Sequence, residues 1–93
     1  MDTGEFYRLL DKFQEDLVTG QCDGTMFIEY ENSNGEVRKI PIMNITQSAT
    51  YGINYIEADC FSEYLADSGN FDFMNCVSSH RTFKISRIIS AKY

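Results

Sequence analysis

The spacing of the apolar residues changes once along this chain, near residue 20, and that change constrains the fold most. In the first twenty residues, apolar side chains recur at the three-and-four spacing of an amphipathic helix. These residues are Phe6, Leu9, Leu10, Phe13 and Leu17. From residue 25 onward they recur at every second position, which is typical of β-strands. We therefore expect a mainly β domain with one N-terminal α-helix, whose apolar stripe either covers a sheet or docks a partner helix.

The ends of the expected helix carry recognisable signals. Asp2 and Glu5 have the spacing of a capping box, and Gly20 is a suitable stop. The sequence predicts a helix over residues 1–20.

A β-hairpin is expected next. Thr25–Tyr30 alternates as a strand, Asn34-Gly35 supplies a turn with positive φ, and Val37–Ile40 returns. Pro41 cannot donate to a strand ladder, so it predicts an edge or a bend before the strand Ile42–Thr46.

A second hairpin follows, with its turn at Ser48–Thr50 and its return strand at Gly52–Phe61. In that strand Ile56, Ala58 and Cys60 would share the buried face, and Tyr55, Glu57 and Asp59 the other.

The pattern weakens over residues 61–80, where Ser62–Asp67 could form a short helix. Ile88–Tyr93 is expected to pair as a last short strand. One helix and several short strands in a single domain of this size favour a small SH3-like antiparallel β-barrel or roll.

Positive charge is concentrated at the end of the chain. Residues 80–93 contain Arg81, Lys84, Arg87 and Lys92 but no Asp or Glu, so the other 79 residues carry a net charge of −10. In one straight strand over Arg81–Ile88, both arginines share a face with Phe83 and Ile85. They are then either rim residues with stems packed on the core or anion ligands at the mouth of the barrel.

Composition excludes several functional classes. The net charge of −6 argues against strong nonspecific nucleic-acid binding, although it permits a local basic site. No apolar run approaches the roughly 20 residues of a membrane span. Acidic residues stand where a signal peptide would be basic, so we expect a cytoplasmic protein.

Three widely spaced cysteines predict neither disulfides nor a zinc site. One histidine, His80, and no nucleophile motif predict a protein that is not an enzyme and has no cofactor or metal.

Five segments occur in an order that resembles the WYL domain family: Ile28–Tyr30, Gly35–Arg38, Pro41, Tyr55–Cys60 and Arg81–Ile88. The resemblance covers roughly residues 25–93. It implies an SH3-like β-barrel of the kind found in bacterial transcription regulators and in CRISPR-associated and other phage-defence proteins, where it senses a ligand or binds nucleic acid. The whole chain would be one WYL-like domain, with a helix over 1–20 and an insertion near 61–80.

The family's Trp-Tyr-Leu signature falls on Asn54-Tyr55-Ile56, so the tyrosine is kept, the leucine is replaced conservatively and the tryptophan is lost. Arg81 and Arg87 occupy positions that resemble the family's ligand-contacting basic residues. The predicted ligand-binding residues are Arg81, Arg87, Tyr55, Arg38 and Lys84.

The expected function is a non-enzymatic sensing module. It would bind an anionic ligand, a nucleotide or a short single-stranded nucleic acid, and modulate a protein partner, or act as a homo-oligomer. The alternative is an acidic protein-interaction module without a small ligand, which uses the helix and the insertion, including Glu63 and Asp67.

Overall fold

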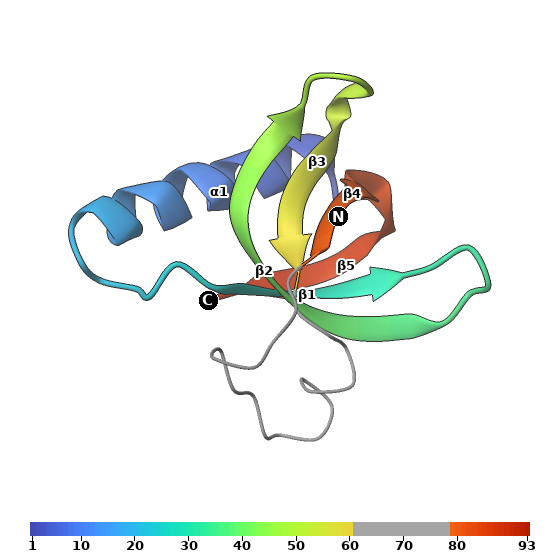
Figure 1. Cartoon of the computed structure of the whole chain (residues 1–93), viewed down its shortest axis with the longest axis horizontal. Coiled ribbons are helices and arrows are strands. Elements are labelled where there is room, and N and C mark those ends of the chain that lie inside the picture. The colour runs from blue at the N-terminus through green and yellow to red at the C-terminus, as the bar shows by residue number, and fades with distance from the viewer. Residues whose placement is uncertain (61–78) are drawn as a thin grey trace.

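The computed structural model describes residues 1–60 and 79–93, which form one α-helix and a five-stranded antiparallel sheet (Figure 1). The elements are α1 (Thr3–Val18), β1 (Met26–Glu31), β2 (Val37–Ser48), β3 (Gly52–Cys60), β4 (Ser79–Lys84), the short 3₁₀-helix η1 (Ile85–Arg87) and β5 (Ile88–Lys92). The strand order is β4-β3-β2-β1-β5, so η1 joins the two edge strands of a curved, unclosed sheet. The mainly β architecture with one N-terminal helix is confirmed. The expected short helix over Ser62–Asp67 lies outside the described residues.

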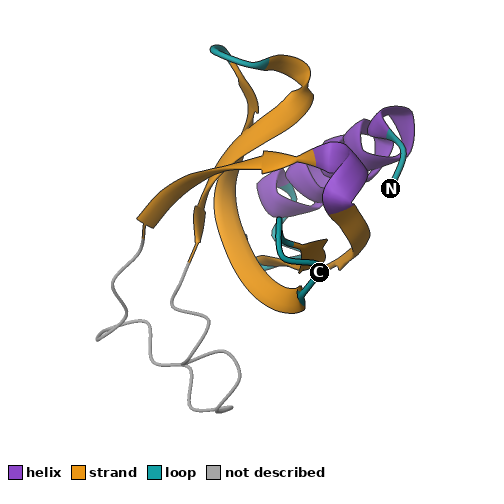
Figure 2. Cartoon of the chain, turned by 90° about the vertical axis from the view of Figure 1, so that its right-hand side faces the viewer, coloured by secondary structure: helices purple, strands orange, loops and turns teal. Residues whose placement is uncertain are grey.

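Helix α1 packs its apolar stripe against one side of the curved sheet (Figure 2). Phe6, Leu10 and Phe13 are buried, whereas Leu17 is 45% exposed. The stripe therefore serves the core over its first three turns and leaves it in the last. None of the described helices is long and apolar enough to cross a membrane.

The ends of α1 differ partly from the prediction. The capping box does not form, because the Asp2 side chain makes no cap hydrogen bond; only its backbone carbonyl accepts, from the Phe6 amide. The stop signal is correct. Gly20 adopts φ +78°, and the Gln21 amide donates to the Asp16 carbonyl at 2.7 Å, which satisfies a carbonyl of the last turn.

The alternation predicted for the strands produces the core. Ile56, Ala58 and Cys60 of β3 are all buried, while Tyr55, Glu57 and Asp59 are half-buried on the other face, as expected. The first hairpin forms with Gly35 at φ +80°, and β5 pairs with β1. Both hairpins and the last strand are confirmed.

Pro41 does not separate two strands, so the break expected before Ile42 was wrong. It lies buried inside the continuous strand β2, opposite Phe27 of β1. Among the described residues, β2 pairs with β3 from Ile42 onward, opposite Cys60. Within that part of the chain, Pro41 therefore pairs with β1 alone.

The straight strand expected over Arg81–Ile88 was also wrong. Strand β4 ends at Lys84, and the 3₁₀ turn η1 intervenes before β5. Ile85 and Ile88 are both buried, and a three-residue turn returns the chain to the core between them. The two-residue alternation therefore stops before Arg87.

Candidate ligand-binding groove

A groove of about 500 Å³ lies where the β1–β2 turn, the β2–β3 turn and the β4–η1 junction meet. Its lining residues share two properties, aromatic or polar character and the lack of a carboxylate. They are Tyr30, Asn32, Ser33, Tyr51, Tyr55, Thr82, Lys84 and Arg87. A volume of this size falls within the range of small-molecule sites.

The two cations reach the groove by different routes. Lys84 lies opposite Tyr55 in the β3–β4 ladder, so both side chains leave the sheet on its non-core face. Arg87 would point to the core side if β4 continued, but η1 turns the chain first. The 3₁₀ turn thus brings Arg87 to the same groove as Lys84 and Tyr55.

Tyr30 joins the core to the groove. Its ring packs edge-on against buried Phe83, with centroids 5.1 Å apart and an interplanar angle of 80°. Its hydroxyl accepts a hydrogen bond from the Lys84 amide at 3.1 Å. These contacts fix the ring in place and satisfy an outward-facing amide of edge strand β4.

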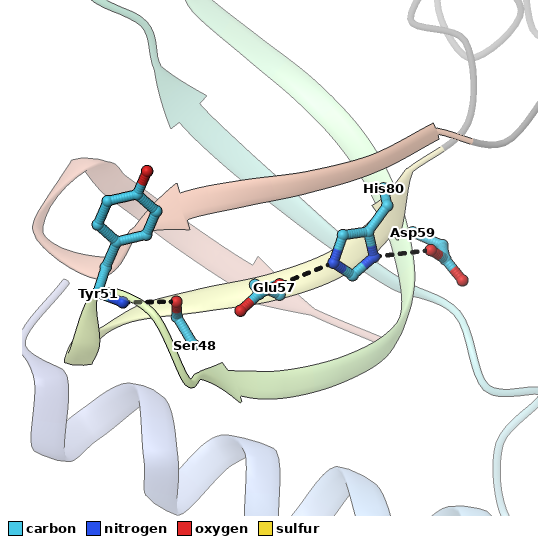
Figure 3. A network of polar contacts seen from close by, with 5 residues as sticks. All are labelled: Ser48, Tyr51, Glu57, Asp59 and His80. Carbon is cyan, nitrogen blue, oxygen red and sulfur yellow. Dashed lines mark hydrogen bonds and ion pairs between the residues drawn. The ribbon is translucent and has the colours of Figure 1, made fainter.

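A tyrosine pair forms another part of the lining. The Tyr51 and Tyr55 ring centroids are 5.5 Å apart, with the planes tilted by 43°. The Tyr51 amide donates to the Ser48 hydroxyl at 3.0 Å, which fixes the β2–β3 turn that carries Tyr51 (Figure 3). Tyr51 is nevertheless 63% exposed, so an aromatic face is available at the surface.

The charge of the groove is not neutralised from within the described chain. Across residues 1–60 and 79–93, neither Lys84 nor Arg87 has an ion-pair partner. Arg38, by contrast, is paired with Glu36 at 3.0 Å. The groove is a local positive site on a chain with 14 acidic and 8 basic residues.

The structure brings together three of the five predicted ligand residues: Tyr55, Lys84 and Arg87. Arg81 does not line the groove, because it lies opposite Ala58 on the core-facing side of the β3–β4 ribbon. Arg38 does not line it either.

Sequence reasoning missed Tyr30, Asn32, Ser33, Tyr51 and Thr82. A usable signal was the second tyrosine, Tyr51, which lies in the β2–β3 turn four residues before Tyr55. Nothing in the local pattern indicated that the β1–β2 turn would face β4.

A second polar cluster lies further along the β3–β4 ribbon, on the same face (Figure 3). His80 contacts Glu57 through Nε2 at 2.9 Å and Asp59 through Nδ1 at 3.1 Å. Asn44 donates from Nδ2 to the other Asp59 oxygen at 2.9 Å. Each ring nitrogen of His80 faces one carboxylate, which favours the imidazolium form, in which both nitrogens donate.

These contacts shift the pKa of all three titratable groups. Hydrogen bonds to Glu57 and then Asp59 raise the pKa of His80. The His80 and Ser48 hydrogen bonds lower the pKa of Glu57, and the Asn44 and His80 hydrogen bonds lower the pKa of Asp59. The cluster is open to solvent.

The described residues form no metal centre. Among them, no group of three or more His, Cys, Asp or Glu side chains could hold a metal ion. Cys76, the cysteine four residues before His80, lies outside the described residues. Cys60 is buried, and Cys22, half-buried, is a free thiol.

No protein-family model, curated protein or solved structure matches this chain.

Proposed function

We propose that this chain is a non-enzymatic binding module that holds a nucleotide, or the end of a short single-stranded nucleic acid, in the three-tyrosine groove. One observation carries the proposal. The groove combines Tyr30, Tyr51 and Tyr55 with Lys84 and Arg87 and has no carboxylate in its lining.

The chemistry of these groups matches a ligand that joins a planar ring to an anionic group. An arginine guanidinium can hold a phosphate through two parallel hydrogen bonds, and a lysine adds a mobile positive charge. Tyrosine rings offer stacking faces to a nucleobase, and base–aromatic stacking contributes about 1–3 kcal/mol per base. The rest of the chain is acidic, so a long polyanion would be repelled. A mononucleotide or a short strand end therefore suits the groove better than a duplex.

We infer further that the fold is an SH3-like roll related to the WYL domain. The groove is then the ligand site, and a protein partner or a second copy of the chain recognises whether a ligand is bound there. A cytoplasmic location is consistent with this proposal. The relation to the WYL domain is supported by the order of the resembling segments in the sequence. It is also supported by the convergence of Tyr55, Lys84 and Arg87 on one groove.

The test is a binding titration of labelled mononucleotides and tetranucleotides at low and moderate salt. Lys84→Ala/Arg87→Ala should weaken binding at least about tenfold, because each residue loses a charge-assisted hydrogen bond. The matched control is Arg8→Ala/Lys12→Ala, which removes the same charge from exposed positions on α1. Equal losses in both double variants would contradict the proposal, since only net charge would then matter.

A protein-interaction module is the second proposal. Its support is an apolar groove of about 460 Å³ between α1 and β2, lined in part by Phe13, Leu17, Met43 and Ile45. Val18, the next residue on the helix, is 88% exposed. Failure of every nucleotide to bind would favour this second proposal over the first. Glu63 and Asp67, which the acidic-surface interpretation named, lie outside the described residues.

A further inference from the structure

We infer that Asn32 makes the groove selective for bases that carry a carbonyl oxygen where adenine and cytosine carry an amino group. The selected bases are uracil, hypoxanthine and guanine. This inference rests on the proposed function and names the ligand class of the same groove.

The Asn32 side chain is held rigidly by the β1–β2 turn. Its Oδ1 accepts from two backbone amides, those of Asn34 at 2.9 Å and Glu36 at 3.0 Å. Its own backbone is also fixed, because its amide donates to the Glu36 carbonyl and its carbonyl accepts from the Gly35 amide. The side chain is half-buried and lines the groove.

These bonds decide which end of the amide remains for a ligand. Backbone amides can only donate, so the atom that receives two of them must be the oxygen. The Nδ2 group then lies at the opposite branch of the side chain, and it has no hydrogen-bond partner within residues 1–60 and 79–93. Asn32 therefore offers a ligand two N–H donors and no free acceptor.

The two charged side chains of the groove are donors as well, whereas the hydroxyls of Ser33, Tyr51, Tyr55 and Thr82 can donate or accept. Lys84 and Arg87 have no acceptor atom in their side chains. The Tyr30 hydroxyl already accepts from the Lys84 amide, which leaves its proton for donation. A ligand that satisfies this groove must bring acceptors: phosphate oxygens for the two cations and a further acceptor for Asn32.

Nucleobases differ in what they present at one ring position. Uracil carries O4 where cytosine carries an amino group, and hypoxanthine carries O6 where adenine carries an amino group. A carbonyl there would accept from Asn32 Nδ2. An amino group would oppose donor to donor and leave both groups unsatisfied, which costs more than the loss of one hydrogen bond.

The experiment compares nucleotide pairs that differ at that position and in the proton on the adjacent ring nitrogen. Dissociation constants are measured by calorimetry for UMP against CMP and for IMP against AMP, with wild type and Asn32→Asp. Aspartate keeps an oxygen for the Asn34 and Glu36 amides but replaces the donor with an acceptor. A ¹H–¹⁵N spectrum of the variant checks that the turn is intact.

Wild type should bind UMP and IMP roughly fivefold to tenfold more tightly than CMP and AMP, as expected for one well-placed hydrogen bond. In Asn32→Asp the ratio should fall to one or reverse, with weaker binding of all four because of the added negative charge. Binding of all four nucleotides without preference would overturn the selectivity and leave the proposed function standing. No binding of any of them, nor of the tetranucleotides, would overturn both.

Discussion

At the scale of single residues, the His80 contacts have a direct consequence for stability. The folded-state pKa of His80 is raised above its ordinary value of 6.5. Its protonated form is therefore favoured by folding, and the stabilisation is fully present below the unfolded pKa and is lost as pH rises through the folded pKa. Glu57 and Asp59 have lowered pKa values, so their contribution is present above their unfolded pKa values and is lost as pH falls through the folded ones.

The measurement is a pair of urea unfolding series across pH, for wild type and His80→Gln. The stability difference between the two proteins should be largest between about pH 5 and 6.5 and should shrink at higher pH. His80 is the only histidine in the chain, so its NMR titration is assigned without ambiguity. A folded-state pKa at or below 6.5, or a difference that grows with pH, would contradict the geometry.

Asn32 shows what a sequence can and cannot say about one side chain. An Asn near a Gly predicts a turn, and the turn forms as expected. That the same turn would face β4 and line a groove depends on pairing between distant strands. The turn that contains Asn32 was therefore predictable from the sequence, whereas the residues that surround its side chain were not.

At the scale of elements, α1 is fixed to the sheet by its first three turns. Leu10 is 5% exposed and Leu17 is 45% exposed, although both continue the same apolar stripe. The last turn is held instead by Tyr93, whose hydroxyl donates to Asp16 at 2.6 Å and whose ring meets Phe13 edge-on at 4.9 Å. The hydrogen bond to Asp16 raises the pKa of Tyr93 to about 12.

Leu10→Ala and Leu17→Ala provide a matched test of this arrangement. Leu10→Ala should lower the free energy of unfolding by about 2–4 kcal/mol, because it leaves a cavity in the core. Leu17→Ala removes the same atoms from a partly exposed site and should cost less than about 1 kcal/mol. Chemical denaturation of both variants checks the difference. Equal losses would mean that the last turn of α1 is buried in solution.

The two wrong predictions about secondary structure concern strand β2 and the turn η1. Pro41 was expected at a boundary because proline removes a ladder donor, but β2 continues through it, paired with Phe27 of β1. Arg81–Ile88 read as one strand because its polar and apolar residues alternate. The alternation describes β4 correctly and fails at η1, since the spacing of Ile85 and Ile88 also fits a turn between two core positions.

At the scale of the whole molecule, the sequence predicted the mainly β architecture with one helix and three of the eight residues that line the groove. The change of apolar spacing near residue 20 was sufficient for one helix and antiparallel strands, and the buried face of β3 followed from alternation alone. Tyr55, Lys84 and Arg87 were predicted by residue type, but Arg81 was grouped with Arg87 on the assumption of a straight strand. Groups that meet only through the curvature of the sheet, such as Tyr30 and Lys84, needed the structure.

Charge distribution at this scale favours selective over general anion binding. The chain has a net charge of −6, yet the groove presents Lys84 and Arg87 and no carboxylate. The negative charge of the whole chain repels a long polyanion, whereas the groove attracts a small anion at short range.

The most direct test of the central claim is a ¹H–¹⁵N NMR titration of the full chain with UMP at low salt. The groove predicts saturable shifts at Tyr30, Asn32, Tyr55, Lys84 and Arg87, with little change at Arg38 or in the first turn of α1. Shifts confined to Arg81 and Arg38, or spread evenly over all basic residues, would contradict the assignment of this groove as the ligand site.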